Sequence, residues 1–372
     1  MKKKIISLVL ATVLAVGCLA GCGSSNTTSG KGYEIALITD KGNIDDKSFN
    51  QGSWEGVLAY TEKNNITHQY YKPEEASDEG YFNAIKLAVE GGAKVIVCPG
   101  YLFEAAVYSA QTQFPDVKFV LLDGEPHTPD YVTYETKSNT ACIMYAEEEA
   151  GYLAGYAAVV DGCTTLGFEG GMAVPAVVAF GYGYLQGIEA AATDLGLADG
   201  SVKVFYHYTG DFAETDANKA VASAMAASGA QVIFGCGGSV GKSVFAATSE
   251  ANIKSIGVDV NQKADSDTVI TSAMKGLGAS VEAVLDSIYT DKFDTYAGKT
   301  TYFTATNDGV GLPDDFERFA TFDKETYDKV YATLADGTVD PIRSFEIADA
   351  AAVTAEQLQT ELGLKKVTVE IR

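Results

Sequence analysis

Two kinds of side chain that bind small molecules, carboxylates and an aromatic ring, occur close together near the start of the chain. Asp40 follows an apolar run at 34–38, and Phe49 follows in the same loop. A ring stacks on a flat group, and a carboxylate accepts hydrogen bonds. The pair therefore favours a neutral, flat, hydroxylated ligand. The alternative is structural, because aspartates commonly support turns and Phe49 would then be a core residue.

The elements that must position these residues are legible beside them. The apolar run at 34–39 predicts a buried strand, and the segment 49–63 predicts a helix that Asp46 or Ser48 can cap. In an open α/β sheet, ligands bind beyond the carboxyl ends of the strands. Asp40 lies at such an end, so its carboxylate is a candidate ligand contact.

Two halves of the chain repeat the same order of elements. The segment 88–100 is echoed by 226–237, and 121–124 is paralleled by 257–260. In the first pair a helix ends at glycine and a β-rich strand follows. In the second pair an aspartate, such as Asp123, ends the strand. The repetition predicts an α/β fold of two doubly wound lobes.

The predicted elements alternate through most of the chain. The predicted strands are 34–39, 66–71, 95–98, 117–122, 165–168, 202–207, 232–234, 255–258 and 269–271. The predicted helices are 49–63, 78–90, 102–113, 145–160, 177–195, 216–227, 240–250 and 278–289. The tail from residue 314 is expected to be helical in part and to pack on the second lobe.

The N-terminus has the pattern of an exported lipoprotein. Three lysines precede an apolar run at 5–16, and Leu-Ala-Gly leads directly to Cys22. This predicts a signal peptide at 1–21, lipidation of Cys22 and a flexible Gly/Ser-rich tether at 22–32. The protein would then be anchored on the extracytoplasmic face of a bacterial cell membrane. The alternative is a plain cleavage site that contains a cysteine.

Composition restricts the class of ligand. The formal charge is −23 at pH 7, which opposes binding to nucleic acid or anionic lipid headgroups. Arginine occurs only at Arg318, Arg343 and Arg372, late in the chain and away from the strand-end loops. A phosphate or carboxylate ligand usually requires an arginine there, so an uncharged ligand is favoured. The cysteines beyond residue 22 match no zinc spacing and the three histidines are scattered, so no metal or cofactor is predicted.

Five stretches of the sequence resemble one family. They are spread in family order over most of the chain, at 38–51, 147–155, 170–175, 237–241 and 256–262. They resemble the basic membrane protein family, whose members are lipoprotein receptors of ABC importers and in several cases bind purine nucleosides.

The resemblance implies a type I periplasmic-binding-protein-like fold with a hinge between two lobes. The chain would cross between lobes near Lys137, Ser272 and Thr301. The expected N-terminal lobe is 33–137 plus 273–300, and the expected C-terminal lobe is 138–272 plus 301–372.

The resemblance also implies how the first lobe contacts a ligand. Asp40 would face the ligand, and Phe49 would cover one face of a base. Asp123 would read the edge of a purine, which suits a carboxylate at a strand end, although a turn residue before Gly124 is the structural alternative.

The resemblance also implies contacts from later in the chain, at Phe212, Asp259 and Lys275. Phe212 would supply a second ring, with Tyr206 and Tyr208 as rivals. The backbone at Gly238 would approach a ribose, because the surrounding glycines fit neither a dinucleotide fingerprint nor a phosphate loop. Asp259 and Lys275 would bind ribose hydroxyls.

The function expected is that of a non-enzymatic, monomeric receptor that captures a nucleoside and docks on an ABC permease. One alternative keeps the receptor and changes the ligand to a sugar, a flavin or a signalling molecule. The other is a calcium-dependent nucleoside hydrolase, whose metal loop the segment 40–46 superficially resembles. That loop would need aspartate and proline where Ile38 and Lys41 stand, and a lysine opposes a divalent cation.

Overall fold

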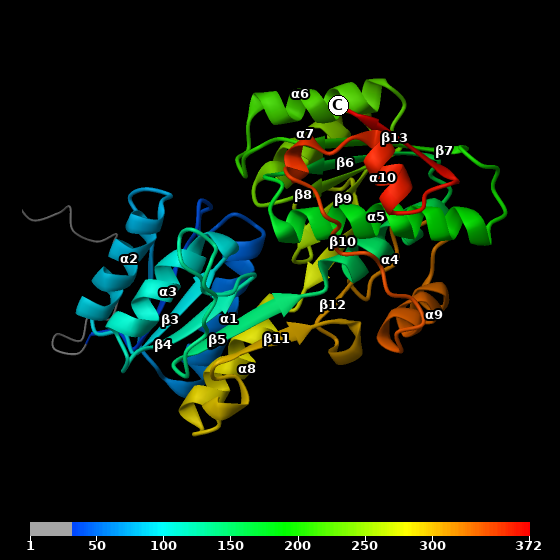
Figure 1. The fold of residues 1–372 in the computed structure, drawn as a ribbon. Coiled ribbons are helices and arrows are strands. Elements are labelled where there is room, and N and C mark those ends of the chain that lie inside the picture. Colours follow the sequence, from blue (N-terminus) through cyan, green and yellow to red (C-terminus); the bar gives the residue numbers. More distant parts are fainter. Residues whose placement is uncertain (1–31) are drawn as a thin grey trace, which may run out of the picture. The chain divides into compact units, whose positions relative to one another are not determined.

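Two largely parallel β-sheets organise the computed structural model, which describes residues 32–372 (Figure 1). The strands of the first sheet are β1 (Ile35–Ile38), β2 (His68–Tyr71), β3 (Val95–Pro99), β4 (Lys118–Leu122), β5 (Thr140–Tyr145) and β11 (Lys299–Phe303). The strands of the second are β6 (Thr165–Gly170), β7 (Val202–Tyr208), β8 (Val232–Cys236), β9 (Lys254–Asp259), β10 (Val269–Lys275), β12 (Val310–Gly311) and β13 (Val367–Ile371). The predicted α/β fold with two parallel-sheet lobes is confirmed.

The strand orders are those of doubly wound sheets. The first sheet runs β11-β5-β4-β3-β1-β2, and the second runs β12-β10-β9-β8-β6-β7-β13. Every pair is parallel except β10 with β12. All residues of β1 and β3 are buried, as expected for strands covered on both faces.

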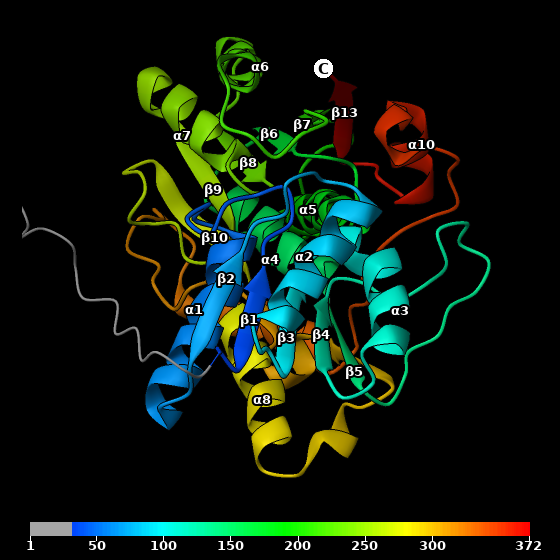
Figure 2. The same cartoon turned by 90° about the vertical axis from the view of Figure 1, so that its left-hand side faces the viewer.

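Helices cover both faces of each sheet. The helices are α1 (Phe49–Asn64), α2 (Asp78–Glu90), α3 (Glu104–Gln113), α4 (Glu147–Val160), α5 (Pro175–Asp194), α6 (Asp216–Ala227), α7 (Val240–Ala251), α8 (Leu277–Tyr289), α9 (Lys324–Ala335) and α10 (Ala355–Glu361). In β1, Ile35 and Leu37 pack with α1 and α8, whereas Ala36 and Ile38 pack with α2 and α3 (Figure 2). The alternation of side chains along a strand explains this division.

Two helix predictions, 78–90 and 216–227, match α2 and α6 at both ends. Side chains of Ser77 and Thr215 accept hydrogen bonds from backbone N–H groups in the first turns of these helices. Such N-caps are readable from sequence, which explains the agreement.

Four paired strands were missed: β5, β11, β12 and β13. The sequence of β5 runs directly into α4, and periodicity cannot separate a short buried strand from a helix start. As a result the chain leaves the first sheet after Tyr145, later than the crossing expected near Lys137. The other changes of sheet follow Lys275 and Phe303, within a few residues of the crossings expected near Ser272 and Thr301. The lobe boundaries stay a proposal.

Helices α4 and α5 approach each other closely through glycines on both. A Cβ on Gly151 or Gly155 would lie 2.2 Å from a carbonyl oxygen of α5, and one on Gly183 or Gly187 would lie 2.0 Å from a carbonyl oxygen of α4. Side chains there would force the helices apart. The contact fixes the start of α4 beside α5.

The predicted signal peptide, the lipidated Cys22 and almost all of the tether lie outside the described residues. Tyr33–Arg372 forms one compact unit. Within residues 32–372, no helix combines the length and apolar character needed to cross a bilayer.

Candidate functional site

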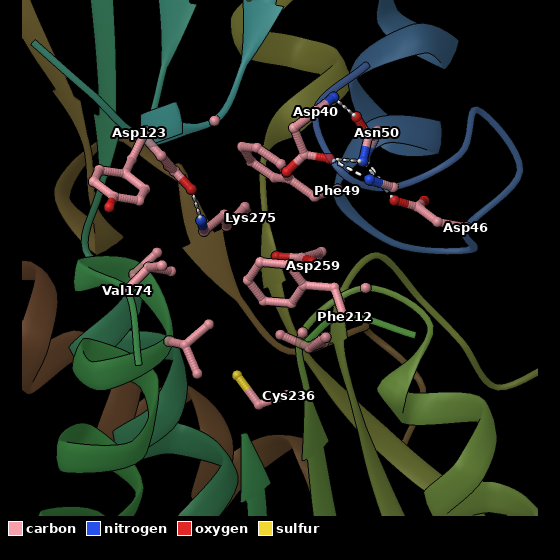
Figure 3. A pocket seen from close by; sticks show the side chains of 18 of the residues that line it. Asp40, Asp46, Phe49, Asn50, Asp123, Val174, Phe212, Cys236, Asp259 and Lys275 are labelled. Carbon is pink, nitrogen blue, oxygen red and sulfur yellow. Dashed lines mark hydrogen bonds and ion pairs between the residues drawn. The ribbon is translucent and has the colours of Figure 1, made fainter. Parts of the chain in front are cut away.

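One cavity between the two sheets brings the predicted residues together (Figure 3). It encloses about 690 Å³ of empty space, including space open to solvent. Its lining includes every predicted contact: Asp40, Phe49, Asp123, Phe212, Gly238, Asp259 and Lys275. Their spatial convergence is observed, and their role as ligand contacts stays a prediction.

Lys275 is the charged centre of this cavity. Its Nζ lies 2.5 Å from Asp123 Oδ2 and 2.8 Å from Glu147 Oε1. The ammonium also lies 4.8 Å from the centre of the Phe49 ring and 5.5 Å from that of Phe180. Its side chain is 1% exposed. A buried ammonium needs such partners, because burial alone lowers the pKa of Lys275 and the neighbouring carboxylates raise it above its usual range.

The buried carboxylates outnumber this ammonium. Burial raises the pKa of Asp123, against the opposing effect of Lys275, and the charge of Glu147 raises it further. Burial also raises the pKa of Asp259. One oxygen of Asp123, Oδ1, is buried and has no hydrogen-bond partner among the described residues. An unsatisfied buried acceptor at a cavity wall is suited to a ligand N–H group.

The two carboxylate oxygens of Asp40 have different surroundings. Its Oδ1 accepts hydrogen bonds from Gly42 N at 2.7 Å and Asn50 Nδ2 at 2.9 Å. Asp46 accepts from Asn50 Nδ2 at 2.8 Å and from three backbone N–H groups at the start of α1, so its predicted capping role is confirmed. The turn alternative for Asp40 is therefore partly right, while its position on the cavity wall leaves Oδ2 for a ligand. Burial raises the pKa of Asp40 to about 6.

The aromatic walls come from opposite lobes. Phe49 begins α1, and Phe212 follows β7; both line the cavity (Figure 3). Of the rivals of Phe212, Tyr206 is buried and stacks on Phe168 with ring centres 4.6 Å apart, and Tyr208 packs against the core and shares a 2.7 Å hydrogen bond with Tyr206. Of the three aromatic candidates, only Phe212 lines the cavity.

Glycines around Phe212 are explained by its ring. A Cβ on Gly171 would lie 2.5 Å from the ring, and one on Gly237 would lie 3.1 Å from it. Gly237 and Gly238 also have positive φ angles of 131° and 51°. The glycine-rich turn thus has a structural reason, and the predicted approach of Gly238 to a ribose stays a prediction.

Two residues without a predicted role, Glu147 and Arg343, are connected to Lys275 by ion pairs: Glu147 directly, and Arg343 through Glu147. Glu147 belongs to a stretch that resembled the family, but nothing in its spacing indicated a buried ion pair. Arg343 was expected to lie away from the strand-end loops. Instead its Nη2 lies 2.7 Å from Glu147 Oε2, one ion pair behind the cavity. The long connection from α9 to this position carries no sequence signal for the contact.

No metal site accompanies these carboxylates within residues 32–372, where no three His, Cys, Asp or Glu side chains are grouped to hold an ion. Cys98, Cys142, Cys163 and Cys236 are free and buried, and Cys236 lines the cavity.

Two parallel α/β lobes with a polar and aromatic cavity at the strand ends define the architecture of a two-lobed solute-binding protein. A solved solute-binding protein of an ABC transporter system from Aeropyrum pernix K1 has this fold, with a TM-score of 0.74, 20% identity, and coverage of 88% of this chain and 98% of that one.

The family is shown by sequence. The Bmp family model, described as ABC transporter substrate-binding protein PnrA-like, matches residues 34–336. The chain belongs to this family, and the resemblance is confirmed. The ABC transporter nucleoside-binding protein BmpA of Lactococcus lactis subsp. cremoris is 29% identical over 91% of this chain and 99% of that protein. Basic membrane protein A1 of Borrelia garinii subsp. bavariensis is 29% identical over 80% and 83% of the two chains.

Proposed function

We propose that this ABC transporter substrate-binding protein captures a purine nucleoside. The observation that carries the proposal is the unpartnered Asp123 Oδ1 in a cavity walled by Phe49 and Phe212. A purine has flat faces for the rings and N–H groups for the carboxylate. The name of the Lactococcus relative supports the same ligand class.

The proposed contacts divide between base and sugar. Asp123 reads the edge of the base, and the two phenyl rings cover its faces. Asp259 accepts from ribose hydroxyls, Lys275 donates to them, and the backbone of Gly238 approaches the sugar. Asp40 accepts a further hydrogen bond through Oδ2. Lys275 is already paired with carboxylates, so the cavity offers no unpaired cation for a phosphate.

In this proposal the protein binds the nucleoside for import and does not transform it. The ligand enters between the lobes, the lobes close by a hinge motion, and the closed monomer docks on the permease. The Cys22 lipid would hold the protein at the extracytoplasmic face of the membrane. Replacing Cys22 with serine should release it from the membrane fraction or leave it unprocessed, and unchanged retention with normal processing would contradict the anchor.

Calorimetry with inosine, guanosine, adenosine and uridine tests the proposal. Asp123→Ala should weaken purine nucleosides by roughly 1–3 kcal/mol, because ring donors lose a buried acceptor. Phe49→Ala should weaken all ligands more evenly, by about 0.5–1.5 kcal/mol beyond lost contact area. If Asp123→Ala leaves every affinity within about twofold, or roughly 0.4 kcal/mol, the assigned site is wrong.

EDTA should leave nucleoside binding unchanged, whereas calcium-dependent binding or hydrolysis would favour an enzyme.

A further inference from the structure

Residues beyond the family match reach back to the charged group behind the cavity. Between α9 and α10 the chain runs without helix or strand at residues 340–347, here called the strap, and it passes α5 and α4 (Figure 1). Gln186 of α5 donates to Ile342 O at 2.9 Å and accepts from Ile342 N at 2.8 Å. The Phe345 ring stacks on Tyr182 with centres 4.8 Å apart and planes 5° apart. The strap is thus fixed on both sides of Arg343.

The guanidinium of Arg343 binds three residues at the start of α4 and just before it. Its Nη1 donates to Tyr145 O at 2.5 Å and to Glu148 Oε2 at 2.8 Å. Its Nη2 lies 2.7 Å from Glu147 Oε2. Both the charge and the planar shape of arginine are therefore used.

Glu147 is held between two cations. Its side chain is fully buried, with Lys275 at one oxygen and Arg343 at the other. Both contacts are close ion pairs, at 2.8 Å to Lys275 Nζ and 2.7 Å to Arg343 Nη2. Charge therefore holds Glu147 in place. Without Arg343, Lys275 would be shared by three buried carboxylates: Asp123, Glu147 and Asp259.

We infer that Arg343 is a positioning residue, which neutralises Glu147 and so keeps the Lys275 ammonium on Asp123 at the cavity wall. The strap thereby determines which carboxylate in the ligand site pairs with Lys275, and it does so without touching the ligand. The effect on affinity rests on the proposed function, but the effect on Lys275 does not.

The inference has a pH-dependent consequence. The ionisable groups that act on Glu147 are Lys275 of β10, Asp123 after β4, Asp259 at the end of β9, Tyr145 of β5, Cys236 of β8, Glu148 beside it and Arg343 of the strap. An opposite charge this close lowers a carboxyl pKa by about 1–3 units. Removing Arg343 therefore raises the pKa of the remaining carboxyls, and Asp123 takes up a proton at higher pH.

The first test observes the Lys275 ammonium directly, in the chain from residue 22 onward labelled with ¹⁵N-lysine. A buried, ion-paired ammonium exchanges its protons slowly and gives an NMR signal at neutral pH. Arg343→Gln should abolish or shift this signal, and Arg343→Lys should largely restore it. The matched control is Arg318→Gln, because the Arg318 side chain is 26% exposed against 27% for Arg343 and also binds backbone carbonyls. The control should leave the signal in place.

The second test is guanosine affinity against pH by calorimetry. Arg343→Gln should move the acid limit of binding upward by about one pH unit, and Arg318→Gln should not. An unchanged Lys275 signal in Arg343→Gln, an equal change in Arg318→Gln, or a lysine variant that behaves like the glutamine variant would overturn the inference. If the wild type binds no nucleoside at any pH, the proposed function fails, while the NMR result still decides the role of Arg343.

Discussion

Asp123 and Asp259 occupy matching places in the two lobes and are used differently. Asp123 follows β4 and Asp259 ends β9, and each has a positive φ angle, 57° for Asp123 and 66° for Asp259. Asp123 pairs with Lys275 of the second sheet and leaves Oδ1 unpartnered among the described residues. Asp259 instead accepts a short hydrogen bond through Oδ2 from Ser48 Oγ, at the start of α1 in the first lobe.

This difference in partners shows how equivalent positions in a repeated fold acquire two roles. The shared backbone position directs both carboxylates towards the space between the lobes, and the partner from the opposite lobe determines which oxygens stay available. Gln262 Nε2 also donates to Lys47 O at 2.7 Å, beside Ser48. Asp259 thus joins the lobes through Ser48, as Asp123 does through Lys275, but Asp123 also keeps Oδ1 without a partner among the described residues.

The largest effect is expected from removing Lys275, the cation that the buried carboxylates share. Lys275→Met leaves Asp123, Glu147 and Asp259 without their common cation, and breaking a buried pair in this way costs about 3–5 kcal/mol. Urea unfolding should show this loss in the free energy of unfolding. Lys219→Met, at a solvent-exposed pair with Glu250, should cost at most about 1 kcal/mol. A loss for Lys275→Met no larger than the control would mean that the buried pairs contribute little.

The next effect separates the two aspartates by ligand preference. Asp123→Asn replaces an acceptor with a group that also donates, so guanosine should lose about 1–3 kcal/mol and adenosine should lose less. Asp259→Asn should weaken both nucleosides equally. Calorimetry on the two variants checks this. If both variants change the preference between the bases in the same way, the proposed division of roles is wrong.

A third strand-ending aspartate extends the comparison, because Asp40 has no cationic partner among the described residues. Its folded-state pKa of about 6 lies above its value in the unfolded chain, so the folded state binds more protons between about pH 4 and pH 6. Stability from this group therefore falls as pH rises through that range. Relative to wild type, the stability of Asp40→Asn should rise by about 2 kcal/mol between pH 4 and pH 7. Urea unfolding at both pH values measures the difference, and exposed Asp116→Asn is the control. An equal pH response in Asp40→Asn and wild type would show that the buried charge is compensated.

The smallest expected effect concerns the contact between lobes. Ser48→Ala removes the hydroxyl that Asp259 accepts from, at about 0.5–1.5 kcal/mol. Because the contact joins the lobes and not the ligand, all nucleoside affinities should fall by the same factor in calorimetry. Ser53→Ala is the control, since Ser53 Oγ bonds Phe49 O within α1. A loss confined to one nucleoside would place Ser48 at the ligand instead.

The sequence by itself determined the fold class, most helices and the convergence of strand-end residues. Apolar runs, caps such as Ser77 and Thr215, and the repeated order of elements are local signals, and they fix α/β units in series. The carboxyl ends of parallel strands meet at one edge, so Asp40, Asp123 and Asp259 were predictable as neighbours of a cavity. The residue types alone also indicated Phe49 and Gly238, and the family resemblance added Phe212 and Lys275.

Only the tertiary structure decided which charges share partners. Strand β5 was hidden because its sequence continues into α4, and its placement moved the first crossing past Tyr145. Glu147 and Arg343 are 196 residues apart in number and meet because the strap crosses α5, a contact that no periodicity encodes. Burial and pairing depend on distances set by packing, such as the glycine contact of α4 with α5. For that reason the sequence identified the acidic and aromatic residues of the site, and tertiary packing decided which oxygen of Asp123 stays without a partner.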